Sequence, residues 1–243
     1  MESMSTPAGT VRALYRYPVK SMAAESLDSV DVSWHGLAGD RRWGFLRAGS
    51  EGNGFPWMTI REKADMWKYQ PSFANPADVE GSRVVVRSPN GREFDVTDPE
   101  LARELGDGVR VMKQYSGIFD TFPLSLLSVQ SVDGLASLVG GSEPSLTALR
   151  FRPSIVIDSS MGGFPEDAWE GRTLRIGPIR LRLNARDQRC MMVNIDPEEP
   201  GRSNPAVLRA IAKERSACFG MYGVAVLPGR ISVGDPVFVE SPD

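Results

Sequence analysis

The chain has 243 residues, of which 41% are apolar and 24% charged, a composition typical of a soluble globular protein. Its formal net charge of −3 excludes a general affinity for nucleic-acid phosphate, and no apolar run approaches the roughly 18 residues that a membrane helix needs. One histidine, His35, and two cysteines exclude a zinc site built from several histidines, a disulfide scaffold and a cysteine-rich iron–sulfur site.

The start of the chain, residues 1–10, is small and polar and lacks the basic and apolar regions of a signal peptide. We therefore expect a cytoplasmic protein with no membrane and no nucleic-acid partner. A reducing compartment would keep Cys190 and Cys218 as thiols. We interpret His35, in a turn-like Trp-His-Gly run, as a turn residue and not as a catalytic base.

Short β-type runs dominate the chain, each marked by alternating or β-branched residues and separated by Gly, Pro, Asn or Asp. In chain order we predict strands at 11–17, 29–33, 42–46, 82–87, 109–114, 154–158, 173–176, 180–184 and 237–240. Many short strands at this spacing favour a barrel or sandwich over alternating βαβ units. The predicted fold class is β-rich α+β.

Helical patterns are fewer, and each begins with a capping residue. We predict helices at 99–105, 128–138 and 204–216, with Asp98, Ser128 and Asn204 as the respective N-caps. Pro99 and Pro205 suit the first helical position. No flexible linker divides the chain, so a boundary near residues 115–118 predicts two closely packed parts.

Cys190 is the first candidate for chemistry, because it follows a strand-like run within Asp-Gln-Arg-Cys. A thiolate is a natural ligand for a soft metal centre such as molybdenum, and the neighbouring Arg186 and Arg189 favour the charged form. A lone cysteine in a strand is, however, more typical of a small buried hydrophobe. Asp187, three residues earlier, is a candidate proton donor.

Basic and hydroxyl side chains recur at predicted strand ends. Lysine, arginine, serine and threonine there suit the phosphate and the polar edges of a pterin. Taken singly, each is more typical of a solvated strand end. The residues in question are Lys20, Ser21, Arg41, Thr121, Arg152 and Ser154.

Five segments in the right order resemble the MOSC (molybdenum cofactor sulfurase C-terminal) family, and the similarity runs from about Val11 to Val239. They are Tyr17-Pro18-Val19-Lys20-Ser21, Asp40-Arg41, Phe151-Arg152-Pro153, Arg189-Cys190 with Asp196-Pro197 beyond, and the end from Phe219 to Val237. The resemblance implies an N-terminal MOSC β-barrel region at 8–116 packed with a MOSC β-barrel domain at 117–240. Within the family, the chain is similar to the mitochondrial amidoxime-reducing component and its bacterial counterparts.

The resemblance implies a molybdenum cofactor, a molybdopterin whose metal is bound by Cys190. It also implies that Lys20, Ser21, Arg41, Thr121, Arg152 and Ser154 hold the cofactor, and we place Arg189 with them. Ser154 stands where the family has asparagine. Asp187 would supply protons to a small-molecule substrate.

The implied reaction is the reduction of N-hydroxylated or N-oxide compounds. Electrons would come from a separate reductase or ferredoxin, because two cysteines cannot hold an iron–sulfur cluster. Two alternatives stay open: a sulfurtransferase or sulfur carrier with a Cys190 persulfide, and a non-catalytic carrier of the cofactor. The family also has a loose association with pyridoxal phosphate binding. We interpret Cys218 as a packed thiol, although a reversible disulfide with Cys190 is an alternative.

Overall fold

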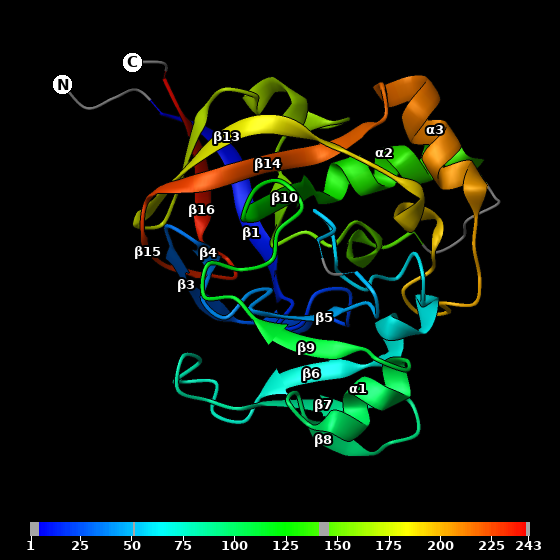
Figure 1. The fold of residues 1–243 in the computed structure, drawn as a ribbon. Coiled ribbons are helices and arrows are strands. Elements are labelled where there is room, and N and C mark those ends of the chain that lie inside the picture. The colour runs from blue at the N-terminus through cyan, green and yellow to red at the C-terminus, as the bar shows by residue number, and fades with distance from the viewer. Residues whose placement is uncertain (1–4, 51, 141–145, 242–243) are drawn as a thin grey trace.

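The first strand of the chain closes a ring of seven strands, because it pairs with strands on both of its sides (Figure 1). The computed structural model describes residues 5–50, 52–140 and 146–241, so the first four residues of the polar start lie outside it. Around the ring the strands are β11 (Ile155–Ser159), β10 (Leu124–Ser128), β14 (Cys218–Leu227), β13 (Ile179–Gln188), β12 (Thr173–Ile176), β16 (Pro236–Glu240) and β1 (Ser5–Arg16).

Irregular pairing lets the long strands curve around the barrel. The register of β1 shifts against β16 between Pro7 and Gly9, and against β11 between Val11 and Ala13. Such bulges bend a strand and increase its twist, which closure into a barrel requires. A short eighth strand, β2 (Glu25–Leu27), pairs with the end of β1.

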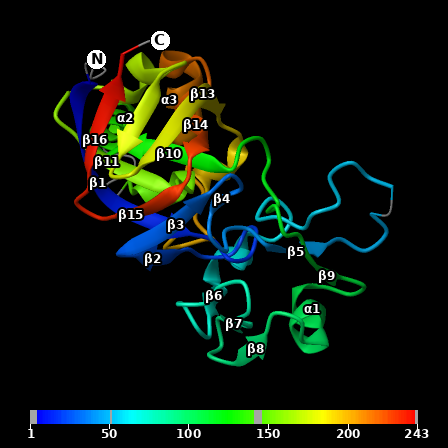
Figure 2. The same ribbon diagram turned by 90° about the vertical axis from the view of Figure 1, so that its left-hand side faces the viewer.

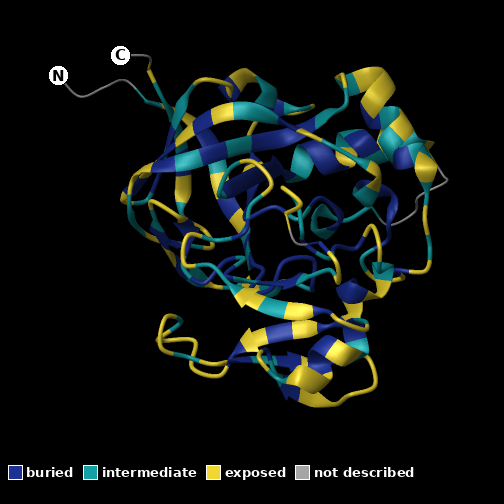
Figure 3. Ribbon diagram, in the orientation of Figure 1, coloured by how far each residue is buried: buried dark blue, intermediate teal, exposed yellow. Residues whose placement is uncertain are grey.

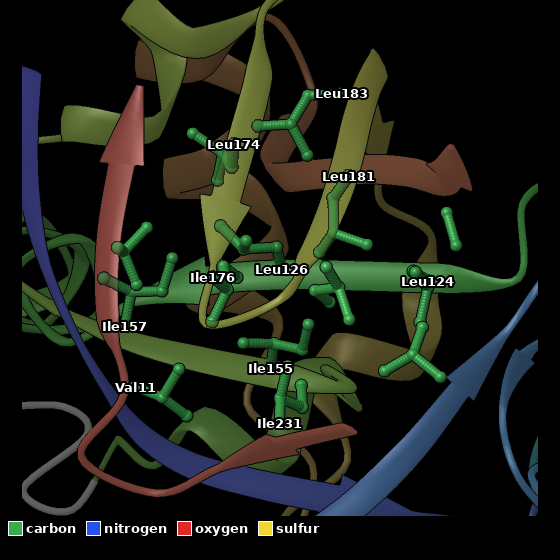
Figure 4. Packing of buried hydrophobic residues seen from close by; sticks show 14 of the residues in the cluster. Val11, Leu124, Leu126, Ile155, Ile157, Leu174, Ile176, Leu181, Leu183 and Ile231 are labelled. Atoms are coloured by element: carbon green, nitrogen blue, oxygen red, sulfur yellow. The ribbon is translucent and has the colours of Figure 1, made fainter. Parts of the chain in front are cut away.

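Apolar side chains fill the barrel interior. Leu126, Leu174, Ile176 and Leu181 are almost completely buried and point into the interior from β10, β12 and β13 (Figure 4). On β13, buried and exposed residues alternate from Ile179 onward, which is the period-2 pattern of a strand with one face inward. The barrel is therefore a packed core and not a pore.

Three small sheets extend the structure beyond the barrel, and two of them, with α1, form a separate layer (Figure 2). This layer has its own apolar core, which includes Phe45, Met66 and Leu101. Its strands are β5 (Trp43–Leu46) with β9 (Arg110–Lys113), and β6 (Gln70–Phe73) with β7 (Val84–Arg87) and β8 (Glu93–Asp95); β3 (Ser29–Ser33), β4 (Gly36–Leu37) and β15 (Gly229–Ser232) form the third sheet.

The described residues form three α-helices, which confirms the three that the capping signals predict. Asp98, Ser128 and Asn204 each accept a backbone hydrogen bond at the start of a helix. The helices are α1 (Pro99–Leu105), α2 (Val129–Val139) and α3 (Pro205–Arg215), and the short 3-10 turns are Ala64–Lys68, Ala148–Phe151, Pro165–Trp169 and Met191–Asn194. Buried faces of α2 and α3 pack on one side of the barrel (Figure 3).

The predicted β-rich α+β class and barrel are confirmed. His35 lies in the turn between β3 and β4, as predicted, and each predicted strand overlaps an observed one. The prediction did not include β14, the ten-residue strand that runs between β10 and β13. Within the described ranges, no helix is long and apolar enough to cross a membrane.

Candidate functional site

A pocket of about 270 Å³ lies where one end of the barrel meets the N-terminal layer. This volume is near the lower end of the roughly 300–1,000 Å³ typical of small-molecule sites. Its wall combines three stretches of the N-terminal part with four from the barrel side. These stretches contribute Lys20, Ser21, Arg41, Phe55, 59–61, Asp120, Thr121, Ser125, 150–152, 187–190, Met192, Val193 and Tyr222.

Backbone hydrogen bonds align the segment after β1 with the segment that precedes β5. Arg41 N donates to Tyr17 O at 2.7 Å, and Lys20 N donates to Trp43 O at 2.8 Å. Ile118 N then donates to Arg41 O, which brings the start of the barrel half to the same place. These bonds explain why two motifs twenty residues apart in the sequence form one wall.

Three pocket residues have a left-handed backbone that side chains other than glycine rarely adopt. The φ angles are 69° at Ser21, 49° at Arg41 and 54° at Arg152, and only two other described non-glycine residues have a positive φ. Such a conformation costs of order 1–3 kcal/mol and persists where the surrounding structure enforces it. Backbone strain of this kind clusters at functional sites, so these three residues indicate that the pocket wall is a candidate functional site.

The pocket is strongly cationic although the chain as a whole is acidic. Lys20 Nζ lies 2.6 Å from Asp120 Oδ1, and the Arg41 guanidinium pairs with the fully buried Asp40. Burial lowers the pKa of Lys20, while the ion pair with Asp120 works in the opposite direction. Burial works to raise the pKa of Asp120, but Lys20, together with Arg41 and Arg61, holds the pKa of that carboxyl below its ordinary value.

Arg152 is held between two aromatic rings on the pocket floor. Its guanidinium carbon lies 4.2 Å from the ring centre of Tyr17 and 4.6 Å from that of Trp67. Nη1 donates to Met22 O at 2.9 Å, whereas buried Nη2 has no hydrogen-bond partner among the described residues. Burial, reinforced by the charge of Arg41, lowers the pKa of Arg152 to about 10. A buried donor without an acceptor calls for a polar ligand.

Cys190 also lines the pocket, as a half-buried free thiol. Arg61 Nη2 lies 3.3 Å from its Sγ, from a residue 129 positions earlier in the chain. Arg189 faces the barrel side, where it donates to Phe151 O and Phe219 O. The described residues hold no group of three or more His, Cys, Asp or Glu that could bind a metal.

Asp187 is a buried residue of the same pocket and belongs to a hydrogen-bonded cluster. It is 2% exposed, its Oδ2 lies 2.8 Å from Arg189 Nη2, and it accepts hydrogen bonds from Ser125 and Tyr222. Burial raises the pKa of Asp187, although Arg189 and the two hydroxyl donors work the other way. Burial also raises the pKa of Tyr222, so that its hydroxyl stays protonated.

The structure brings all but one of the predicted site residues to this pocket. Cys190, Asp187, Lys20, Ser21, Arg41, Thr121, Arg152 and Arg189 line it. Ser154 does not: it is fully buried behind the wall, where its Oγ accepts from Ser125 N. The left-handed backbone at Arg152 changes the direction of the chain. Ser154 then forms a backbone hydrogen bond with the neighbouring barrel segment, because its N donates to Ser125 O.

The structure also shows the surroundings of Cys218 and Asp196, two residues outside the pocket. Cys218 is a half-buried free thiol at the start of β14, and neither cysteine is in a disulfide. Asp196 accepts from Glu198 N, as a turn residue before proline does, and also pairs with buried Arg150.

Sequence reasoning assigned no role to Arg61, Phe55 or Tyr222. Tyr222 stands in the segment from Phe219 to Val237 that the family resemblance includes, and Arg61 in Thr59–Glu62, a further stretch that also matches the family. Their motifs gave a signal, but their contacts with Cys190 and Asp187 are long-range and needed the fold.

Comparisons with known proteins agree with this architecture. The family model described as MOSC domain matches residues 113–238, and the one described as MOSC N-terminal beta barrel domain matches residues 8–115. Human mitochondrial amidoxime-reducing component 1 is 34% identical over 153 residues, 58% of this chain and 43% of that protein. Molybdenum cofactor sulfurase of Drosophila grimshawi is 28% identical over 268 residues, 92% of this chain and 34% of that protein.

The chain thus spans less than half the length of these two relatives. Among solved structures, the YuaD protein of Bacillus subtilis superposes with a TM-score of 0.54 at 15% identity. The match covers 99% of this chain and 100% of that one. At this identity the likeness supports the fold alone.

Proposed function

The chain belongs to the MOSC family, with the family's N-terminal beta barrel, and on that premise we propose that it is a molybdenum-cofactor-dependent oxidoreductase that reduces N-hydroxylated or N-oxide compounds. One observation carries the proposal. A thiol and a group of buried cations line one pocket, and a cofactor with a metal at one end and a phosphate at the other needs both kinds of group. A separate protein would supply the electrons.

The residues present suit that cofactor. Lys20, Arg41 and Arg152 can neutralise a phosphate, and the unpartnered Nη2 of Arg152 offers it a hydrogen bond. The hydroxyls of Ser21 and Thr121 suit the polar edges of a pterin. Cys190 offers the soft sulfur ligand that molybdenum takes. When bound, the cofactor supplies two-electron redox chemistry, and the protein supplies placement and protons.

Asp187 donates one of the two protons that this two-electron reduction consumes as the oxygen leaves as water. Its raised pKa keeps the carboxyl protonated to a higher pH than an ordinary aspartate, and Ser125 and Tyr222 fix its orientation. Release of oxygen from nitrogen needs a proton at the oxygen, so a protonated carboxyl in the pocket wall suits a general acid.

The Asp187→Asn variant is expected to lose about 10²- to 10⁴-fold in kcat, because an amide cannot donate this proton. In the parent protein, kcat falls as the pH rises through the raised pKa of Asp187, since the deprotonated form is inactive. That falling limb disappears in Asp187→Asn. The check is kcat against pH, with molybdenum content measured in parallel to confirm loading.

Tyr222→Phe is the matched variant. It removes a hydrogen bond that favours the carboxylate, so the pKa of Asp187 rises further and the falling limb moves to higher pH. A profile unchanged in both variants would remove Asp187 from the role of acid.

The function is tested on purified, cofactor-loaded protein with a chemical reductant in place of the donor protein. We expect stoichiometric molybdenum by elemental analysis and conversion of benzamidoxime, a simple amidoxime, to benzamidine. Loaded protein that converts no amidoxime, hydroxylamine or N-oxide would refute the reductase and favour a cofactor carrier. Transfer of the cofactor to a cofactor-free enzyme would then be the measurement to make.

Sulfur transfer is the second candidate, and one observation favours it. The sulfurase match covers 92% of this chain, against 58% for the human reductase. Cys190 is half-buried and open to the pocket, as a sulfur carrier requires. Intact-mass analysis that finds an added sulfur on Cys190, in protein without molybdenum, would support this alternative.

A further inference from the structure

Arg61 differs from the other cations of the pocket in its exposure. Six cationic side chains line the described pocket, and Arg61 alone among them is exposed to solvent. Lys20 and Arg41 lie on the buried side, with 8% and 14% of their side chains exposed. A cation at the open side of a pocket meets an incoming ligand and not a deeply held cofactor.

A short turn holds Arg61 in this place. Arg61 N donates to Thr59 Oγ1 at 3.2 Å, while Thr59 N and Oγ1 both donate to Glu62. Arg47 pairs with the same Glu62 from the strand β5 side. The turn is therefore fixed from both sides, and the Arg61 side chain points to the sulfur of Cys190.

The carboxylates near Arg61 are engaged elsewhere. Glu62 accepts from Thr59 and Arg47, and Asp120 accepts from Lys20. Among the described residues, the Arg61 guanidinium contacts the thiol of Cys190 and the ring of Phe55, whose centre lies 6.0 Å away. The guanidinium thus has donors in excess of its acceptors, and a planar fork of donors matches a carboxylate.

We propose that Arg61 forms a subsite for a carboxylate of the substrate beside Cys190, and that the protein therefore selects N-hydroxylated substrates that carry a carboxylate. This inference rests on the proposed function for the reacting group and adds the class of substrate. Phe55 lies beside the same guanidinium, and its ring centre is also 5.5 Å from Lys20 Nζ. Its ring offers an apolar face to an aromatic or flat substrate body.

The test compares benzamidoxime with 4-carboxybenzamidoxime, which differ by the carboxylate alone. Binding is measured by calorimetry on the cofactor-loaded protein without reductant, so that no turnover occurs. We expect about tenfold to a hundredfold tighter binding of the carboxylate compound, the range of a charge-assisted hydrogen bond. Arg61→Gln should abolish that preference, so that the two compounds bind to the variant within about threefold of each other.

Two further variants serve as controls. Arg61→Lys keeps the charge but not the planar fork, so it should retain part of the preference. Arg103→Gln makes the same change of charge on α1, outside the pocket, and should bind both compounds like the parent protein. Equal binding of the two compounds by the parent protein, or an undiminished preference in Arg61→Gln, would overturn the subsite.

The subsite and the proposed function fail in different ways. Protein that retains molybdenum and reduces benzamidoxime but does not prefer the carboxylate refutes the subsite and leaves the reductase intact. Protein that retains no molybdenum refutes the proposed reductase function, and the proposed substrate class, which rests on that function, is then refuted as well. Elemental analysis separates these outcomes before any ligand is added.

Discussion

Replacing Cys190 with serine is expected to strip molybdenum from the purified protein and to lower amidoxime reduction at least about a hundredfold. Loss of an outer-shell partner costs roughly 10- to 100-fold in metal affinity, and loss of the protein's one ligand should cost more. A serine hydroxyl is a hard, neutral oxygen donor that does not replace a thiolate. Elemental analysis and turnover with a chemical reductant are the measurements.

The fold should tolerate this change. Cys190 is half-buried at the pocket wall, so the free energy of unfolding should change by less than about 1 kcal/mol. Cys218→Ser is the control, because Cys218 is also half-buried but does not line the pocket. If Cys190→Ser kept its molybdenum and its turnover, the cysteine would not be the metal ligand.

Arg152→Met should weaken cofactor binding by about 10- to 100-fold for each charge-assisted hydrogen bond lost. The cofactor-free protein should lose little stability. Methionine keeps an apolar body between Tyr17 and Trp67, and it removes a buried charge that Arg41 repels. The hydrogen bond to Met22 O is lost, which offsets part of that gain.

The measurement is the melting temperature with and without cofactor, because a ligand that binds only the folded state stabilises it. In Arg152→Met the cofactor-induced rise should shrink or vanish. Arg175→Met is the matched control, since Arg175 stacks on Phe238 at 4.3 Å on the barrel, away from the pocket. A full cofactor-induced rise in Arg152→Met would remove Arg152 from the phosphate site.

The sequence sufficed for those parts of the fold that local chemistry decides. Helix starts are local, because Asp98, Ser128 and Asn204 each bond within three residues of themselves. Strand β14 was missed because Gly220 and Gly223 lower its β propensity, and its place depends on partners far along the chain. At Gly220, a Cβ would lie 2.8 Å from Leu126 O, so the fold itself requires this glycine.

In the candidate site, too, the sequence predicted what local residue types decide and not what depends on long-range contacts. Residue types and the family resemblance identified Lys20, Arg41, Arg152 and Cys190, but not the distances among them. Arg61 could not be assigned from its own motif, because its partner lies 129 residues away. Ser154 is the opposite case. Its position in the motif predicted a place in the pocket, but pairing with the neighbouring strand directs its side chain to Ser125 N, behind the pocket wall.

The arrangement of the barrel has a consequence for biosynthesis. Strand β16 lies between β12 and β1, and Ser5 of β1 pairs with Glu240 of β16 (Figure 1). Because β1 is synthesised well before β16, β1 lacks this partner until β16 has been made. Until residues 236–240 leave the ribosome, β1 and β12 keep open edges that invite pairing with other chains. The ring should therefore close only after β16 has emerged from the ribosome, and chaperones that shield such edges should matter most before that point.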